Sequence, residues 1–484
     1  MDENEVFQNQ NTNQSGDVPQ VSQAPESPQS FQPEYLATPA PAGAELPGNN
    51  ASSQFPLMKI VKLLIGILVV IFIAIIIFMV VIPSFTKKTN QKVTLTYWGL
   101  WEDSRIMQSI ISDFQKQNPN ITITYLKQDI KQYRESLTTR INNGNGPDIF
   151  RFHNSWYPMF STILLPLPSD TISKTDFSQW FYPVAQKDLI KNGAIYGIPL
   201  HIDTLALYIN SDLFKSAGLK VPTDWNNFIN DAKMLTVKNA EGKIQTAGAA
   251  LGAFDNVNHS PDILSLLFLQ NGVDINNISS SSQKVIDALN FYTSFALGSD
   301  AVWDNTLDSS LLAFSRGNLA MFFGYSWDYF AVKAINPNLN FEIAPVPQLP
   351  NSNVTFASYW VEGVSVKSKH QKEALLFMKF LADKSTQEKL YSEQARTRVF
   401  GELYARKDLA DKLKENTLVN PFIQQAKTAS SSFFVDGTND NGLNYQMNTY
   451  LGNAVNSILN NISAQTAVDT LSQGVSKVLK QYGQ

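Results

Sequence analysis

Residues 93–150 read VTLTYWGLWEDSRIMQSIISDFQKQNPNITITYLKQDIKQYRESLTTRINNGNGPDIF, and this stretch decides the fold. Apolar and polar side chains alternate over Val93–Tyr97, which is typical of a strand. A helix follows, with Asp103 or Ser104 as its N-cap and its apolar side chains spaced along one face. A second strand, a second helix and a short buried strand are then predicted at residues 121–125, 133–141 and 147–150. This order predicts right-handed crossovers and a largely parallel sheet.

The rest of the globular part continues to mix strands and helices, and it contains no internal repeat. Further strands are predicted at residues 194–198, 204–209, 319–323, 341–346 and 361–366. Further helices are predicted at residues 225–235, 263–270, 284–297, 372–381, 386–394 and 449–482. A mixed pattern of this length predicts an α/β protein of two domains.

An apolar run precedes the globular part: residues 63–82 read LLIGILVVIFIAIIIFMVVI, without a charged side chain. As a helix, this run is long enough to cross the ~30 Å hydrocarbon core of a membrane. A cleaved signal peptide would begin near the N-terminus and end at small residues, which this run does not. We therefore expect a retained transmembrane anchor at residues 59–83. A disordered tail rich in Gln, Asn, Pro and Ser is expected before it, at residues 1–58, and a polar linker after it, at 84–92.

Composition narrows the range of functions. The net charge of −4 gives no indication of a nucleic-acid partner. The absence of cysteine excludes disulfides, thiol catalysis and cysteine-ligated metals, and a total of 4 histidines argues against a histidine-rich metal site. No GxSxG, HExxH or Walker motif is present, so neither an enzyme nor a cofactor is expected.

Three segments of the globular part are specific when they are taken together. They are NNGNGPDIFRFHNSWYPMF (142–160), NGAIYGIPLHIDTLALYIN (192–210) and AFSRGNLAMFF (313–323). With these segments in this order, residues 93–484 resemble the extracellular solute-binding proteins of ABC importers. The resemblance is to the sugar-binding group, which is similar to maltose-binding protein.

The resemblance implies a two-lobed α/β fold of the periplasmic-binding-protein type, with a hinge that the chain crosses three times. The crossings are expected near residues 201–204, 343–346 and 396–400. The lobes are expected to comprise residues 93–202 with 345–398, and residues 203–344 with 399–484. The family implies that a solute binds between the lobes, that closure of the hinge buries it, and that separate permease and ATPase subunits transport it.

The resemblance also implies a location. Lysines flank the apolar run on both sides, so local charge leaves the orientation open, and large domains cross membranes largely regardless of charge. Because a receptor of an importer faces outward, we expect a single-pass protein of the plasma membrane with a cytoplasmic N-terminus and a monomeric extracytoplasmic domain. Family members are usually released to a periplasm or held by a lipidated cysteine, so the helix anchor departs from the common pattern.

Candidate solute contacts follow from the chemistry of sugars, which have faces of C–H groups and rims of hydroxyl groups. Aromatic planes suit the faces, and a few convergent polar side chains suit the hydroxyls. The candidates in loops and at strand ends are Trp98, Trp101, Glu102, Asp103, His153, Asn154, Trp156, Asp203, Tyr208, Trp303, Tyr325, Trp327, Asp328, Trp360 and Glu362. The resemblance favours Trp327 as the residue that stacks on a sugar ring.

Several of these residues have a second interpretation. Trp98 is equally a core residue, Asp103 is equally a helix cap, and Asp203 is equally a residue that fixes the hinge. His153 is interpreted as a hydrogen-bond partner, because no metal-ligating residue lies at the required spacing. Residues 436–442, DGTNDNG, resemble a calcium loop but lack its full spacing, so a plain turn is predicted.

Four functions compete at this point. The first is a sugar receptor of an importer, which the supply of tryptophan favours. The second is a glycosidase, which would require two carboxyl groups at a defined separation across one bond. The third is a receptor for another solute, such as a peptide, a polyamine or a phosphorylated polyol. The fourth is a surface scaffold without transport.

Overall fold

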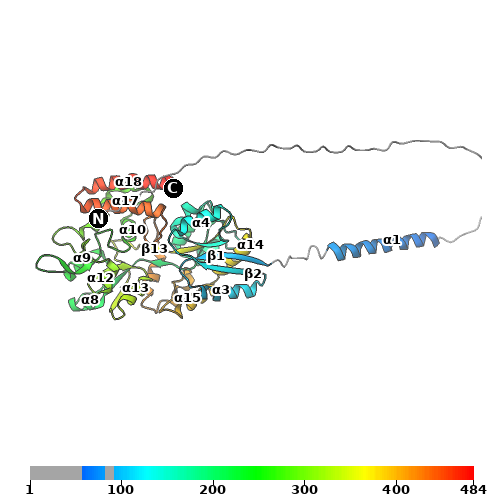
Figure 1. Cartoon of the computed structure of the whole chain (residues 1–484), viewed down its shortest axis with the longest axis horizontal. Helices are drawn as coiled ribbons and strands as arrows, with labels where there is room; N and C mark the ends of the chain where they lie inside the picture. Colours follow the sequence, from blue (N-terminus) through cyan, green and yellow to red (C-terminus); the bar gives the residue numbers. More distant parts are fainter. Residues whose placement is uncertain (1–56, 82–91) are drawn as a thin grey trace, which may run out of the picture. The chain divides into compact units, whose positions relative to one another are not determined.

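The computed structural model describes residues 57–81 and 92–484 (Figure 1). The predicted disordered tail (1–58) and linker (84–92) lie almost entirely outside the described residues. Helix α1 (Leu57–Ile76) continues as the π-helix η1 (Ile77–Val81). Within them, Val61–Met79 is long and apolar enough to cross a membrane, which agrees with the predicted anchor by length and composition.

The first lobe is built on a five-stranded sheet with the order β2-β1-β3-β14-β6. Its strands are β1 (Val93–Gly99), β2 (Ile121–Lys127), β3 (Ile149–His153), β14 (Trp360–Val364) and β6 (Ile198–Pro199). β1 pairs in parallel with β2 and with β3. The connections carry α3 (Ser104–Gln117) and α4 (Tyr133–Asn142), so the predicted alternation of strand and helix over residues 93–150 is confirmed.

The second lobe has its own five-stranded sheet with the order β12-β8-β11-β10-β9. Its strands are β8 (Ala206–Asn210), β9 (Val237–Lys238), β10 (Ile244–Ala249), β11 (Leu319–Gly324) and β12 (Phe341–Ala344). β8 and β11 are buried along their whole length, as continuous apolar runs at the centre of a sheet should be. The helices of this lobe include α9 (Trp225–Leu235), α10 (Ser260–Gln270), α11 (Ser282–Ser294), α12 (Ser310–Ser315) and α13 (Asp328–Ile335).

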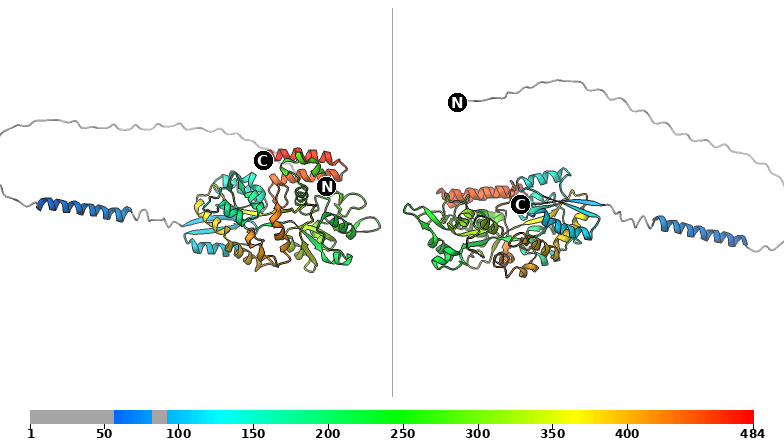
Figure 2. Two further views of the ribbon diagram at one scale, coloured as in Figure 1. Left: turned by 180° about the vertical axis from the view of Figure 1, so that it is seen from behind. Right: turned by 60° about the horizontal axis from the view of Figure 1, so that its bottom comes forward.

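The single C-terminal helix predicted at residues 449–482 is wrong. The structure has two helices, α17 (Leu443–Leu459) and α18 (Ala464–Gln481), which lie side by side in each view (Figures 1 and 2). Asn461 adopts the left-handed conformation (φ 64°) between them, and the Ser463 hydroxyl accepts a hydrogen bond from the Thr466 N–H at 3.1 Å. The left-handed turn ends α17 and the N-cap begins α18, although the apolar period continues on both sides.

Two hydrophobic cores show where the chain passes from one lobe to the other. Ile202 packs in the core of the first lobe and Leu205 in the core of the second. Further along, Leu390 packs in the first core and Phe400 in the second. These two changes fall at or beside the first and third predicted crossings.

The second change of core comes later than expected. Phe356 packs in the second core and Ala357 in the first, whereas the crossing was expected at residues 343–346. Val346 still packs in the second core. The change falls within β13 (Thr355–Ser358), the middle strand of a small sheet with β7 (Asp203–Thr204) and β15 (Ala429–Ser430). The fold is therefore two-lobed; later in the chain than Phe400, the residues Ala405, Ala426 and Ala429 also pack in the first core.

The remaining elements are short or lie at the periphery of the lobes. The helices are α5 (Tyr157–Phe160), α6 (Lys174–Trp180), α7 (Pro183–Leu189), α8 (Ser211–Ala217), α14 (Gln371–Ala382), α15 (Lys384–Ala395) and α16 (Asn420–Gln425). The 3₁₀ helices are η2 (Asn154–Trp156), η3 (Ile275–Ser281), η4 (Lys407–Lys412) and η5 (Ala426–Thr428). A two-stranded ribbon joins β4 (Ile190–Lys191) to β5 (Ala194–Ile195), so the strand predicted at 194–198 is divided between β5 and β6.

Candidate functional site

A cavity of about 360 Å³ lies where the two lobes and their connecting segments meet. It is lined by Trp101, His153, His201, His259, Trp327, Ser358, Trp360, Arg398, Glu402, Asp436 and Gly437. We call this cavity the cleft. Four of the predicted contact residues line it, and they come from both lobes.

Three tryptophans form the aromatic part of the cleft. Trp101 lies in the loop between β1 and α3, and its ring meets the edge of Trp360 at 5.5 Å between centroids. Trp327 lies between β11 and α13 in the other lobe, and it stacks on Tyr325 at 4.3 Å. Trp101 is 43% exposed and Trp327 is 38% exposed, although large aromatic side chains are usually well buried. Both lobes thus present an open indole face to one cavity.

Three of the four histidines of the chain line the cleft. His153 lies between the hydroxyls of Ser155 (2.8 Å) and Ser358 (3.0 Å), and burial lowers its pKa to about 3. Burial also lowers the pKa of His201, whose Nδ1 has no hydrogen-bond partner among the described residues. At neutral pH both rings are therefore neutral. The two serine hydroxyls occupy both ring nitrogens of His153, whereas His201 Nδ1 is left to bond with a further hydroxyl group.

His259 differs from the other two histidines. Burial opposes its charge, but the carboxylates of Asp328 and Asp436 raise its pKa well above the usual value. Its Nε2 lies 3.0 Å from Asp328, and its Nδ1 lies 3.5 Å from Asp436. The donor atoms of His259, Asp262 and Asp436 lie within 4.8 Å of one another, a spacing that could suit a metal ion. A protonated imidazole has no free lone pair, so the contacts favour an ion-pair cluster over a metal site.

Glu102 and Glu362 were predicted to contact the solute, but the structure buries both against Arg151. Arg151 Nε donates to Glu362 Oε1 at 2.7 Å, and Arg151 Nη1 donates to Glu102. All three side chains are at most 2% exposed. Burial raises the pKa of Glu362, and Arg151 offsets this only in part. Arg151 thus joins the segments that carry the cleft residues Trp101, His153 and Trp360.

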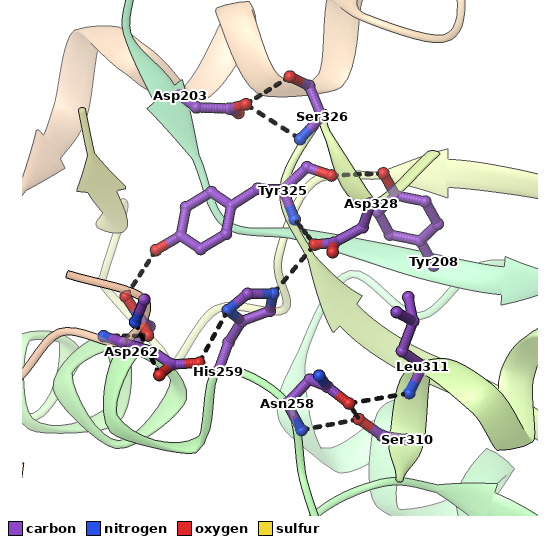
Figure 3. A network of polar contacts seen from close by, with 12 residues as sticks. Asp203, Tyr208, Asn258, His259, Asp262, Ser310, Leu311, Tyr325, Ser326 and Asp328 are labelled. Atoms are coloured by element: carbon purple, nitrogen blue, oxygen red, sulfur yellow. Dashed lines mark hydrogen bonds and ion pairs between the residues drawn. The ribbon is translucent and has the colours of Figure 1, made fainter. Parts of the chain in front are cut away.

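Asp203, Tyr325 and Asp328 hold the segment that carries Trp327 (Figure 3). The Ser326 N–H donates to Asp203 Oδ2 at 3.0 Å, and the Tyr325 N–H donates to Asp328 Oδ2 at 2.7 Å. The Tyr325 hydroxyl donates to Asp262 at 2.8 Å. None of the three side chains lines the cleft, and their hydrogen bonds indicate that they support its aromatic wall.

The other predicted contacts lie in the cores or beside them. The Tyr208 hydroxyl donates to the Tyr325 carbonyl at 2.6 Å, and Trp303 Nε1 donates to Asn256 at 2.9 Å. Trp98 and Trp156 are buried in the first core, where their aromatic rings pack against apolar neighbours. Asn154 lines a second cavity, of about 210 Å³, and its amide donates to Asp188 at 2.8 Å.

Asp103, interpreted from the sequence either as a solute contact or as a helix cap, is the N-cap of α3. Its Oδ1 accepts a hydrogen bond from the Arg105 N–H at 2.8 Å, and its backbone is extended as an N-cap requires.

We expect Asp103→Ala to lower the melting temperature by about 1–2 °C without changing solute affinity. Asp103→Ser, which can still cap the helix, should match the unsubstituted chain in thermal denaturation. Loss of solute affinity in the serine variant would contradict this assignment.

Sequence reasoning missed several residues of the cleft: His259, Ser358, Arg398, Glu402, Asp436 and Gly437. They come from separate segments that approach one another only in the folded chain. Arg398 and Glu402 are four residues apart and form an ion pair at 2.7 Å, a spacing visible in the sequence. Residues 436–442 contain three left-handed residues, as the predicted turn requires, and they also form part of the cleft wall.

The comparisons with known proteins agree with this geometry. The family model described as bacterial extracellular solute-binding protein matches residues 98–388. The multiple sugar-binding protein of Streptococcus mutans is 24% identical over 341 residues, which cover 63% of this chain and 75% of that protein. The maltodextrin-binding protein MdxE of Bacillus subtilis is 26% identical over 341 residues, covering 67% and 76%. The solved structure of the sugar-binding protein MalE from Xanthomonas citri matches with a TM-score of 0.67 at 18% identity. The match covers 80% of this chain and 98% of that chain, so the two proteins share the fold.

Proposed function

The chain belongs to the bacterial extracellular solute-binding protein family, and we propose that it is the carbohydrate receptor of an ABC importer. The observation that carries this proposal is the cleft, where Trp101 and Trp360 of one lobe and Trp327 of the other line one cavity. A sugar ring offers apolar C–H faces to such indoles and hydroxyl groups to the polar side chains beside them. The relatives named for multiple sugars and for maltodextrin support the same class of solute.

The proposed mechanism is capture by closure of the hinge. The two lobes have separate cores, so the lobes could rotate about the small sheet of β7, β13 and β15, where the chain passes from one core to the other. Closure would bring Trp327 toward Trp101 and exclude water from the bound sugar. Neutral His201 would bind a hydroxyl group through Nδ1 without carrying a charge into the closed cleft, and neutral His153 would hold Ser358 in the cleft wall.

We further propose that the receptor stays attached to the membrane through Val61–Met79. The family is extracellular, so residues 92–484 would face outward and the N-terminus would be cytoplasmic. A tethered monomeric receptor would meet its permease by diffusion in the plane of one membrane. Its partners would be the permease and ATPase subunits of the importer.

The test is thermal denaturation of the full chain in detergent with a panel of solutes. The panel contains mono- and oligosaccharides, including maltose, maltotetraose and mannobiose, together with amino acids, peptides, polyamines and polyols. A ligand at one hundred times its Kd should stabilise the folded state by about 2.7 kcal/mol, so the melting temperature rises. We expect a selective rise with one class of sugar.

Other outcomes of the panel decide between the competing functions. A rise with a peptide or a polyamine and none with any sugar would keep the receptor but overturn the solute class. A rise with a sugar that is then hydrolysed would identify a glycosidase. The relatives are binding proteins, so we expect the sugar to be recovered intact.

A further inference from the structure

His259 connects the segments that form the wall of the cleft in the second lobe. It precedes α10, and its ring reaches Asp328 on a second segment (Figure 3). The ring also reaches Asp436 on a third segment. We call residues 324–328 the Trp327 loop and residues 436–442 the 436 loop. The edge of the imidazole also meets Tyr325 at 5.0 Å between centroids. One ring thus contacts both loops at the point where they line the cleft.

The backbone of His259 supports a specific role for this side chain. Its φ is 60° and its ψ is 25°, a left-handed conformation that residues other than glycine rarely adopt. Asn and Gly tolerate that conformation better than His does. A residue held in a costly conformation beside a binding site is a candidate for function. The contacts of the imidazole give the physical reason why a histidine occupies this position.

The charges around the ring require a cation between the two loops. Asp328 faces it from the start of α13, Asp436 from the 436 loop, and Asp262 from α10. Tyr325 faces it from the Trp327 loop. Across the cleft the titratable and charged side chains are His153, His201, Arg398 and Glu402. A neutral ring would leave the carboxylates of Asp328 and Asp436 facing one another without a counter-charge.

We propose that His259 is a positioning residue of the cleft, because its ring bridges Asp328 and Asp436 and thereby holds Trp327 in place. This inference rests on the function proposed above, in that Trp327 is taken to bind the sugar. The Trp327 ring stacks on Tyr325, and the Tyr325 N–H donates to Asp328, so movement at Asp328 is transmitted to the indole. His259 itself acts through these residues.

The same bridge reaches the first lobe. The 436 loop begins at Asp436, and the carbonyl of Asp440 in that loop accepts a hydrogen bond from Arg134 Nε of α4. The Ser155 hydroxyl of η2 donates to Asn444, just after the 436 loop, at 2.9 Å. Through the 436 loop, His259 therefore connects the Trp327 wall with the contacts between the lobes.

Loss of the proton from His259 should release Trp327. A histidine with a raised pKa contributes its full stabilisation below its ordinary pKa of about 6.5, and the contribution is lost as the pH rises through the raised value. Burial raises the pKa of Asp262 to about 7, so this carboxyl titrates around neutral pH, and the loss of sugar affinity that belongs to His259 should appear as a separate fall at alkaline pH. Asp436→Asn removes one carboxylate, so the alkaline midpoint should move to lower pH.

The test uses the full chain in detergent and the sugar found with the thermal panel, with its Kd measured by calorimetry from pH 6 to pH 10. His259→Asn keeps a residue that tolerates the left-handed backbone, but one amide carries no charge to bridge two carboxylates. We expect it to bind at least tenfold more weakly at pH 7, with little dependence on pH. His370→Asn, at the one histidine outside the cleft, should behave as the unsubstituted chain.

A second measurement needs no sugar. Acrylamide quenching of Trp327 is obtained as the difference between each chain and its Trp327→Phe counterpart. We expect stronger quenching in His259→Asn at pH 7, and a rise in quenching of the unsubstituted chain at alkaline pH. Unchanged quenching together with an unchanged pH profile would overturn the inference, whereas failure of every sugar to bind would overturn the proposed function alone.

Discussion

Trp327→Ala is expected to weaken sugar binding by about 30-fold or more. Truncation of an aromatic hot-spot residue typically costs about 2 kcal/mol or more, and each 1.4 kcal/mol is a factor of ten in Kd. Trp327 offers the open indole of the second lobe, and in the variant one face of the sugar would meet water or a void. Calorimetric titration of the full chain with the sugar from the thermal panel measures the change.

The matched control for this variant is Trp180→Ala. Trp180 lies on α6 of the first lobe, where the Arg406 guanidinium sits 4.3 Å from its ring, and it does not belong to the residues that line the cleft. Its loss should leave the Kd within about twofold of the unsubstituted value. Equal weakening by the two variants would show that Trp327 acts through general stability and would contradict its role as a contact residue.

Arg151→Met is expected to lower the free energy of unfolding of the first lobe by about 3–5 kcal/mol. Removal of one partner from a buried ion pair leaves an uncompensated charge, and here one guanidinium serves both Glu102 and Glu362. The methionine retains much of the apolar stem, so the lost charge dominates the effect. Urea denaturation of the full chain at pH 7, followed by tryptophan fluorescence, measures the loss.

The dependence of this loss on pH separates charge from packing. In the variant the two carboxylates lack a counter-charge, so their pKa values rise in the folded state, and stability falls as the pH increases through those values. We therefore expect a larger loss at pH 8 than at pH 5. Arg105→Met removes a guanidinium whose side chain is 89% exposed, and it should leave the midpoint unchanged. Equal losses at the two pH values would contradict an electrostatic origin.

The architecture of the first lobe could be predicted because its sequence signals are local. Val93–Tyr97 alternates, and the next helix has a cap and an apolar face. The short buried strand expected at 147–150 is present but lies at Ile149–His153. The break between α17 and α18 also had a local signal, since an asparagine pair precedes Ser463. The continuing apolar period outweighed that signal in the prediction.

The cleft could be predicted only in part. Trp101, Trp327 and Trp360 follow or begin strands, so residue type and position were sufficient to propose them. The burial of Glu102 and Glu362 could not be predicted, because nothing local shows that Arg151, from the strand between their segments, reaches both carboxylates. Such a partner is defined by register across a sheet, and a single sequence does not determine register.

The most direct measurement is a crystal structure of the full chain, or of residues 92–484, with the sugar that raises the melting temperature most. We predict that the sugar lies in the cleft, with one face on Trp327 and its other side toward Trp101 and Trp360. We also predict a hydroxyl group within hydrogen-bond distance of His201 Nδ1. A sugar bound outside the cleft, with these tryptophans still exposed to solvent, would contradict the assignment of this cavity as the solute site.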